Sequence, residues 1–165
     1  MPEDLLTSDQ SPHRTQRLGS YAVATRIGRD GAEEILLTRI STTGFPAGWW
    51  TLPGGGVDHG ESPNVAVERE LYEETGLAAT ASQLVAVHDI HIVDQGRDDM
   101  YEDYHGVHLL YRVAVDPDAT PHVVEVGGST DLAMWVRVEA VGVADDHSPI
   151  LPMVQYVLDR IDQYR

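Results

Sequence analysis

Residues 54–77, GGGVDHGESPNVAVERELYEETGL, predict a glycine-rich loop that leads into one helix with clear end signals. Ser62 is a good N-cap, Pro63 suits the first helical position, and Gly76 suits the left-handed position just past the end. We therefore predict a helix over residues 63–75. Any fold for this chain must hold that loop and helix against the segments on either side of them.

Strand-like segments lie on both sides of this helix. They carry short apolar or alternating runs, and turn-forming residues separate them. They span residues 21–27, 34–40, 83–93, 106–115, 122–126 and 132–138. A second helix is predicted over residues 149–161, after Ser148. Two helices among this many strands favour an α+β fold with a mixed sheet over a regular βαβ series.

The chain length of 165 residues fits one domain with a core of its own. Residues 1–17 are polar and lack periodicity, so we predict a flexible N-terminal tail there and a single domain over residues 18–165. There is no cysteine, which excludes disulfides and thiolate metal sites. No apolar run approaches the roughly 20 residues that cross a membrane, so we predict a cytoplasmic protein with no membrane partner.

The formal net charge of −16 restricts the partners of this chain. A surface this acidic repels polyanions, so we expect no nucleic acid polymer among them. A small anionic ligand is still compatible where metal ions supply the attraction. The oligomeric state is open, and a homodimer is one alternative.

Three glutamates, Glu70, Glu73 and Glu74, fall on one face of the predicted helix. Like charges at these spacings each cost about 0.2–0.5 kcal/mol, which a solvated acidic face tolerates. Beside a glycine-rich loop with free carbonyls, however, converging carboxylates form the oxygen-rich site that Mg²⁺ or Mn²⁺ prefers. A plain acidic surface and a divalent-metal site are the two interpretations of this face.

The segment from Gly55 to Leu77 resembles the Nudix box at every fixed position. The box reads G, five residues, E, seven residues, R, E, an aliphatic residue, any residue, E, E, any residue, G and an aliphatic residue. The matching positions are Gly55, Glu61, Arg69, Glu70, Leu71, Glu73, Glu74, Gly76 and Leu77. A pattern this long is highly specific, and the similar order of strand-like segments extends the resemblance to about residues 18–162.

The resemblance implies an α/β/α sandwich around a mixed sheet and a hydrolase that acts on a nucleoside diphosphate linked to another group. Water attacks a phosphorus of the pyrophosphate with the help of Mg²⁺ or Mn²⁺, which neutralises phosphate charge. The substrate would be a small anionic nucleotide derivative: a nucleotide sugar, ADP-ribose, a dinucleotide or a (d)NTP.

The resemblance also implies roles for individual residues of the box. Glu70, Glu73 and Glu74 would be metal ligands and catalytic residues, with the carbonyl of Gly55 as a further oxygen ligand. Arg69 would hold these carboxylates in place by bidentate hydrogen bonding. The partner of Arg69 would be Glu61, another fixed position of the box.

The general base is left open, because within this family it comes either from the box or from a later loop. Glu125, which precedes the Gly127–Gly128 turn, is one candidate. The acidic segment between the two long strands offers three more: Asp99, Glu102 and Asp103. Ordinary surface charge is the alternative for each of them.

Two residues outside the box are candidates for substrate binding. Phe45 lies in a loop and could stack on a base, whereas Trp50 is expected to pack in the core. Arg39 could reach a phosphate or carboxylate, with a surface salt bridge as the alternative. Four histidines on or beside neighbouring strands are expected to be scattered, with room for one of them near the ligand, rather than to form a metal site: His88, His91, His105 and His108.

Two other classes of function stay open beside the hydrolase. A catalytically silent Nudix-fold module could bind nucleotide derivatives as a sensor or interaction domain, although its intact glutamates argue against this. The acidic face could also be only a salt-tolerant surface.

Overall fold

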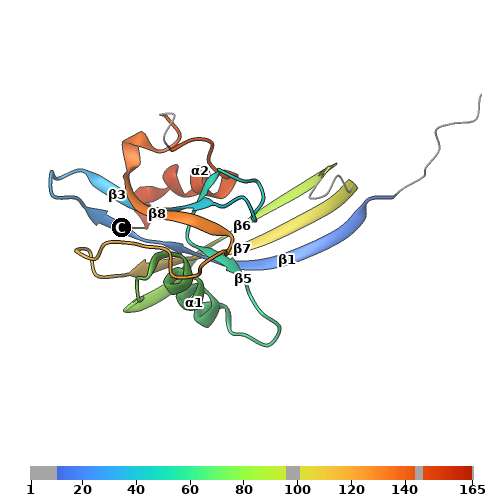
Figure 1. Ribbon diagram of the computed structural model, residues 1–165, viewed down its shortest axis with the longest axis horizontal. Helices are drawn as coiled ribbons and strands as arrows, with labels where there is room; N and C mark the ends of the chain where they lie inside the picture. Colours follow the sequence, from blue (N-terminus) through green and yellow to red (C-terminus); the bar gives the residue numbers. More distant parts are fainter. Residues whose placement is uncertain (1–10, 96–100, 144–146, 165) are drawn as a thin grey trace, which may run out of the picture.

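The computed structural model describes residues 11–95, 101–143 and 147–164 of the chain. It contains two four-stranded sheets (Figure 1). The first has the order β5-β1-β7-β6, with bounds Gly54–Gly56, His13–Val23, Tyr101–Ala114 and Ala81–Gln95. In the second, β3 (Glu33–Ile40) pairs with β2 (Thr25–Ile27), β4 (Trp50–Thr51) and β8 (Thr130–Arg137). The predicted mixed sheet is confirmed, because β1 runs parallel to β7 and antiparallel to β5.

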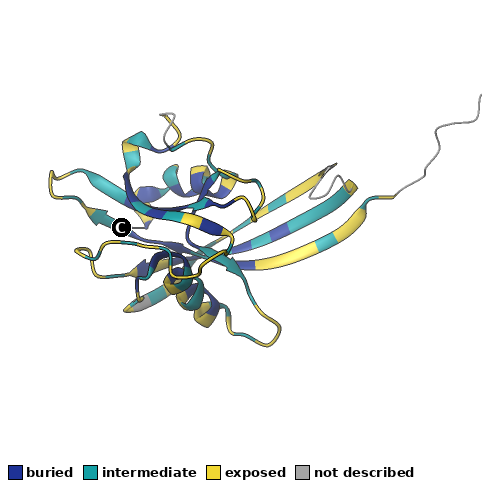
Figure 2. Cartoon of the chain, in the orientation of Figure 1, coloured by how far each residue is buried: buried dark blue, intermediate teal, exposed yellow. Residues whose placement is uncertain are grey.

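Two helices cover the strands from opposite sides in Figure 1, α1 (Pro63–Thr75) and α2 (Pro152–Leu158). Short 3₁₀ turns lie on either side of α2 in the chain, at Val138–Ala140 and Ile161–Gln163. Each helix has its own apolar core, visible as buried segments in Figure 2. Val67 and Leu71 of α1 pack in one cluster, while Met153, Val154 and Val157 of α2 pack in the other. No helix among the described residues is long and apolar enough to cross a membrane.

The helix α1 has the predicted bounds. Gly76 ends it with φ 67°, and its N–H donates to the carbonyl of Tyr72 at 2.8 Å. Ser62 occupies the N-cap position, but its hydroxyl bonds to Asn64 instead of a helix N–H. Leu71 and Leu77, the two aliphatic positions of the box, are buried.

The first sheet is longer than the sequence predicted. Residues 13–17, expected in the flexible tail, belong to β1 and pair with β7 from Glu102 to Gly106. Residues 101–105, expected in a loop, begin β7. The three strands β1, β7 and β6 therefore extend together beyond the helices (Figure 1). The polar composition of these residues suggested that water satisfies their backbone N–H and C=O groups. In the structure, pairing between strands satisfies them instead.

Two other predicted elements were wrong. Residues 122–126 form no strand, because the N–H groups of His122, Val124 and Glu125 donate to the carbonyls of Thr75 and Glu73 at the end of α1. The second helix begins three residues later than expected, at Pro152. Residues 149–151 are extended beside Trp50, whose N–H donates to the Pro149 carbonyl at 2.8 Å.

Candidate active site

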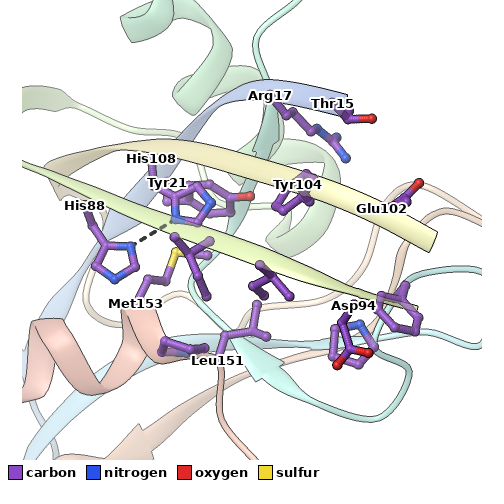
Figure 3. Close-up of a pocket in the computed structure, with 15 residues that line it drawn as sticks. Thr15, Arg17, Tyr21, His88, Asp94, Glu102, Tyr104, His108, Leu151 and Met153 are labelled. Carbon is purple, nitrogen blue, oxygen red and sulfur yellow. Dashed lines mark hydrogen bonds between the residues drawn. The ribbon is translucent and has the colours of Figure 1, made fainter. Parts of the chain in front are cut away.

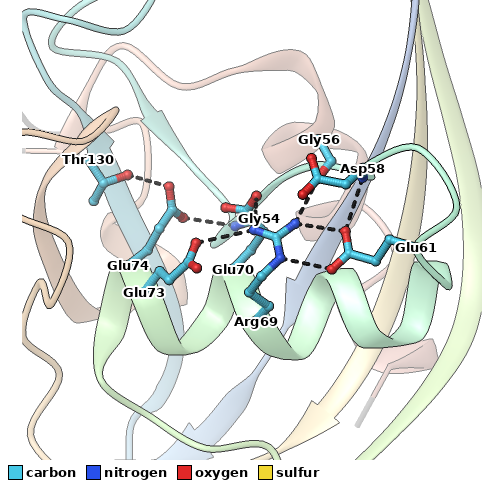
Figure 4. A network of polar contacts seen from close by, with 9 residues as sticks. All are labelled: Gly54, Gly56, Asp58, Glu61, Arg69, Glu70, Glu73, Glu74 and Thr130. Atoms are coloured by element: carbon cyan, nitrogen blue, oxygen red, sulfur yellow. Dashed lines mark hydrogen bonds and ion pairs between the residues drawn. The ribbon is translucent and has the colours of Figure 1, made fainter.

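Glu74 is the most enclosed side chain of the predicted acidic face. It is only 4% exposed, and both of its oxygens accept hydrogen bonds (Figure 4). The N–H of Gly54 donates to Oε2 at 2.9 Å, and the hydroxyl of Thr130 donates to Oε1 at 2.5 Å. Burial raises the pKa of Glu74 to about 7, with the charges of Glu70 and Glu125 adding to the rise. This helix position therefore holds a carboxylate that needs a positive charge nearby to ionise fully.

Arg69 is the positive centre of the acidic face. Its Nε and Nη2 donate to the two oxygens of Glu61 at 2.8 and 2.9 Å, so the predicted pairing of these two side chains is present. Its Nη1 donates to Glu70 at 2.9 Å and to Glu73 at 3.2 Å, and Nη2 also reaches the Gly56 carbonyl. The bond from Arg69 lowers the pKa of Glu61 to about 2. We call Glu61, Arg69, Glu70, Glu73 and Glu74 the glutamate cluster (Figure 4).

Gly55 lets the loop approach this cluster closely. It pairs with Ser20 of β1, and a Cβ added to it would lie 2.7 Å from the carboxyl carbon of Glu70. Only a residue without a side chain leaves room for that carboxylate. Burial also raises the pKa of Glu70, partly offset by Arg69.

A cavity of about 490 Å³ opens on the α2 side of the first sheet (Figure 3). Its floor is formed by side chains that alternate along β1, β6 and β7, and the segment from Leu151 to Met153 covers it. Phe45, a predicted substrate-binding residue, lines this cavity and is 58% exposed. Asp94 and Glu102 lie opposite each other at its outer end.

Two cavity residues join this space to the glutamate cluster, and the sequence did not identify either. Tyr21 pairs with Gly54 in the register, and Glu70 and Glu74 both act on its hydroxyl electrostatically. Burial raises the pKa of Tyr21 to about 12. Arg17, which was assigned to the tail, lies with its Nη2 3.0 Å from where a Cβ on Gly56 would be. The alternation of side chains along a strand could have placed both residues on one face, but only if that strand had been predicted to start before residue 17.

The other predicted site residues are distributed differently. Arg39 lies outside the cavity, where its Nε donates to Asp131 at 2.8 Å. Asp103 points to the opposite face of the sheet from Glu102 and pairs with Arg14 and His91. Asp99 lies outside the described residues. Trp50 is buried in the core, as expected.

The four histidines are not scattered. The strand register sets His88 directly opposite His108 and His91 directly opposite His105. The first pair lines the cavity, and the second lies on the other face of the sheet. On each strand the two histidines are three residues apart, and they point to opposite faces of the sheet, as predicted. The sequence did not reveal which histidines lie opposite each other on the two strands.

Comparison with known proteins identifies the family. The NUDIX domain family matches residues 19–155. This chain belongs to that family. The match includes all of the Nudix box and all strands that line the cavity except the first residues of β1.

Three individual proteins illustrate the similarity. An RNA pyrophosphohydrolase of Cereibacter sphaeroides is 31% identical over 124 residues, which cover 70% of this chain and 73% of that protein. A human diphosphoinositol polyphosphate phosphohydrolase is 29% identical over 119 residues, 72% of this chain and 58% of its own length. The crystal structure of a MutT NUDIX hydrolase from Burkholderia pseudomallei has a TM-score of 0.68 and 29% identity, covering 89% of this chain and 98% of that one. This Nudix chain therefore spans less than two thirds of the human relative.

The Nudix box here offers a donor set of oxygens alone, which suits a hard divalent cation. The raised pKa of the buried Glu74 fits a neighbouring positive charge in the active protein. Among the described residues, however, no three His, Asp or Glu side chains converge as a metal site. Arg69 holds the Glu70 and Glu73 carboxylates instead. The chemistry of the donors thus fits the cation, while Arg69 supplies the compensating charge in this arrangement.

Glu125 is a predicted base candidate that lies beside this cluster. Its backbone N–H donates to the Glu73 carbonyl at 3.0 Å, and its charge raises the pKa values of Glu70 and Glu74. Its carboxylate folds over Gly128, where an added Cβ would lie 2.3 Å from Oε2. The loop that was expected to be a strand therefore delivers this carboxylate to the Nudix helix.

Proposed function

We propose that this chain is a divalent-metal-dependent hydrolase that cleaves a pyrophosphate bond in a small nucleotide-derived substrate. The observation that carries the proposal is that two residues of the cavity lining also lie beside the cluster: Glu70 and Glu74 act on Tyr21, and Arg17 lies against Gly56. A ligand with its organic part in the cavity would have its phosphates beside the loop from Gly54 to Gly56. The names of the relatives, which include pyrophosphohydrolases, agree with this chemistry.

The residues of the box would divide the work as follows. Glu70, Glu73, Glu74 and the Gly55 carbonyl would hold Mg²⁺ or Mn²⁺, which neutralises phosphate charge and lowers the pKa of bound water. Arg69 would keep its carboxylates oriented, braced by Glu61. This arrangement lets the chain bind an anion despite its own net charge of −16.

The other residues would bind the substrate and move a proton. Arg17 would donate to phosphate oxygens, because its guanidinium lies beside Gly56 at the entrance from the cavity. Glu125 would accept a proton from the attacking water, since its charge already acts on Glu70 and Glu74. Glu102 is less suited to that role, because it lies at the outer end of the cavity.

The substrate class follows from the charge and shape of the cavity. Apolar and aromatic side chains line most of it, including Tyr21, Phe45 and Met153, and two carboxylates lie at its outer end. Such a cavity disfavours a polyanionic ring of the kind named for the human relative and favours a nucleoside. We therefore propose a nucleoside diphosphate linked to another group, hydrolysed in the cytoplasm.

A homodimer would form most simply along β6, which is the last strand of its sheet in the described part of the chain. Its residues Leu84, Val87 and Val93 are each about half exposed. Unpaired strand edges with apolar side chains favour association with a second strand. Light scattering of the purified chain would test this state directly.

The test of function is phosphate or nucleotide release from a substrate panel with Mg²⁺ or Mn²⁺. The panel contains ADP-ribose, dinucleoside polyphosphates, NADH, nucleotide sugars and (d)NTPs. Glu74→Gln should lower any observed rate by about 1000-fold, because it removes a ligand charge. Glu68→Gln is the matched control on the same helix, since Glu68 bonds to Ser82 away from the cluster, and it should leave the rate within about twofold.

The outcome also decides between the hydrolase and the silent binding module. Release of product from none of these compounds, with tight binding of one of them, would assign the chain to the sensor class. Absence of any site-specific divalent binding in calorimetry would instead reduce the cluster to an acidic surface.

A further inference from the structure

The cavity floor carries two histidines that the proposed hydrolysis does not use. His88 and His108 lie opposite each other on β6 and β7, and their Nδ1 atoms are 3.1 Å apart. The rings are nearly parallel, at 13°. Tyr21 packs edge-on against His108 and Tyr156 against His88, each with ring centroids 5.1 Å apart. We call His88 and His108 the histidine pair (Figure 3).

A hydrogen bond between two ring nitrogens couples the protonation of both rings. One Nδ1 must carry a proton and the other must accept it, so two neutral rings hold opposite tautomers. The Nε2 of the donor ring is then an acceptor, and the Nε2 of the other ring is a donor. If both tautomers exchange, each Nε2 reverses its role while the Nδ1 bond is kept.

The surroundings keep the pair neutral. Burial lowers the pKa of His108 to about 4, and His88 and Arg17 lower it further, whereas Asp89 acts in the opposite direction. Burial also lowers the pKa of His88, again opposed by Asp89. Around pH 7 neither ring carries a charge, so the coupled tautomers are the relevant states.

Gly106 opens the space in which His108 meets the cavity. A Cβ added there would lie 2.9 Å from His108 Nε2 and 2.9 Å from the Tyr104 hydroxyl. Arg17 of β1 and Ile90 of β6 flank Gly106 on either side in the register. The side chains of His108 and Tyr104 therefore lie over Gly106, and they bring one imidazole nitrogen and one hydroxyl to the centre of the cavity floor.

We propose that the histidine pair reads the planar base of the substrate: His108 Nε2 bonds to the base, and His88 positions the His108 tautomer. For its substrate class this inference rests on the proposed function. The rings of His108 and Tyr104, which lie over Gly106, suit a planar ligand ring packed beside them, and apolar neighbours suit an uncharged one. Because the two tautomers of the histidine pair exchange, His108 Nε2 donates to a keto oxygen of the base or accepts from an amino group. The site therefore accepts both kinds of base.

Calorimetric binding of reaction products measures this recognition without turnover. The probes are nucleoside 5′-monophosphates and ribose 5-phosphate, which lacks the base. We expect at least one monophosphate to bind about tenfold or more tightly than ribose 5-phosphate. In whichever pair binds better, uridine with cytidine or inosine with adenosine, the keto and amino members should agree within about threefold.

Substitutions in the pair separate recognition from folding. His108→Asn keeps an amide near Nδ1 but removes Nε2, and Gly106→Ala displaces Nε2, so both should bring monophosphate affinity to within about threefold of ribose 5-phosphate. His88→Asn can still donate or accept and should retain the wild-type preference. His88→Phe keeps the packing on Tyr156 but leaves His108 Nδ1 without its partner. The affinities for the keto and the amino monophosphate should then differ by about tenfold.

Nitrogen NMR of the two imidazoles gives a signature that a purely structural role would not produce. Long-range ¹H–¹⁵N spectra should show complementary neutral tautomers at pH 7, and addition of the keto or the amino monophosphate should shift them in opposite directions. Equal affinities for monophosphates and ribose 5-phosphate, an unchanged preference in folded His108→Asn, or matching tautomers in both rings would each overturn the inference. Product release is assayed separately, so base-dependent binding without hydrolysis would reject the proposed function alone.

Discussion

Glu74 of the glutamate cluster and His108 of the histidine pair are both buried, yet their pKa values shift in opposite directions. In the cluster, burial raises the pKa of Glu74 from 4.5 to about 7. In the pair, burial lowers the pKa of His108 from 6.5 to about 4. Loss of solvent disfavours the charged form of both groups. The charged form of the carboxyl is the deprotonated one, whereas the charged form of the imidazole is the protonated one.

This difference separates a cluster whose negative charge favours a bound cation from a pair of rings that stays uncharged. Glu70, Glu73 and Glu74 leave negative charge that Arg69 only partly compensates, so a divalent ion would be stabilised there. The cavity holds neutral rings among apolar side chains and suits the uncharged part of a ligand. A nucleotide with its phosphates at the cluster would match both regions at once.

The contrast is tested most strongly at Gly55. Gly55→Ala sets a methyl 2.7 Å from the Glu70 carboxyl carbon and must displace that carboxylate. We expect a loss of about 100-fold in kcat/KM, because small misplacements at a reacting centre are costly. Steady-state kinetics across a Mg²⁺ titration measure the effect, while base-dependent product binding in the cavity should stay within about threefold.

Gly60→Ala is the matched control in the same loop. Gly60 has φ +83°, and a Cβ added there would have no heavy atom of a non-adjacent residue within 4 Å. An alanine therefore adds backbone strain of about 1–2 kcal/mol but no clash with the cluster. If Gly60→Ala reduced kcat/KM as much as Gly55→Ala, general loosening of the loop would explain both results.

The cost of the buried carboxyl should appear as a stability gain in Glu74→Gln without divalent ions. A raised pKa means that the contribution of Glu74 to stability is complete below pH 4.5 and is lost as the pH rises through about 7. At pH 8 the variant should therefore unfold with a free energy about 1–3 kcal/mol higher than the wild type. Urea unfolding in EDTA at pH 8 and pH 5 measures this, and equal stability at pH 8 would argue against an uncompensated charge.

The two regions also differ in how far the sequence predicts them. The glutamate cluster lies within one loop and helix, so helical spacing was enough to place Glu70, Glu73 and Glu74 on one face. The resemblance to the Nudix box supplied the pairing of Glu61 with Arg69. Helix end signals at Ser62 and Gly76 act over a few residues and were read correctly. Thr130 completes the Glu74 site from β8 and had no signal of its own.

The cavity depends on strand register, which one sequence does not reveal. β1 pairs in parallel with β7, matching His13 to Glu102 far along the chain, and only this pairing brings Arg17 beside Gly106. Valines at 123, 124 and 126 suggested a strand, but the free carbonyls at the end of α1 accept the N–H groups of that segment instead. In both places, contacts between segments distant in the chain outweigh local propensity.

The histidine pair predicts the opposite pH response from the cluster. A lowered pKa means that the contribution of His108 to stability is complete above pH 6.5 and is lost as the pH falls through about 4. His108→Gln should flatten this part of the profile by about 1–2 kcal/mol between pH 7 and pH 4.5. Thermal melts of both proteins over this range, in EDTA, test the prediction. An unchanged slope would mean that the imidazole is solvated in the folded protein.

The smallest effects are expected at Phe45 and Arg39, the two residues outside the box that were predicted to bind substrate. Phe45 lines the cavity, so Phe45→Ala should raise KM about 3–10-fold with little change in kcat, because stacking contributes to binding alone. Its high exposure keeps the effect on stability small. Arg39 is held by Asp131 outside the cavity, so Arg39→Gln should leave KM within about twofold and cost about 0–1 kcal/mol in stability. A larger rise in KM for Arg39→Gln than for Phe45→Ala would place the outer part of the substrate over β3 and β8 instead of over the cavity.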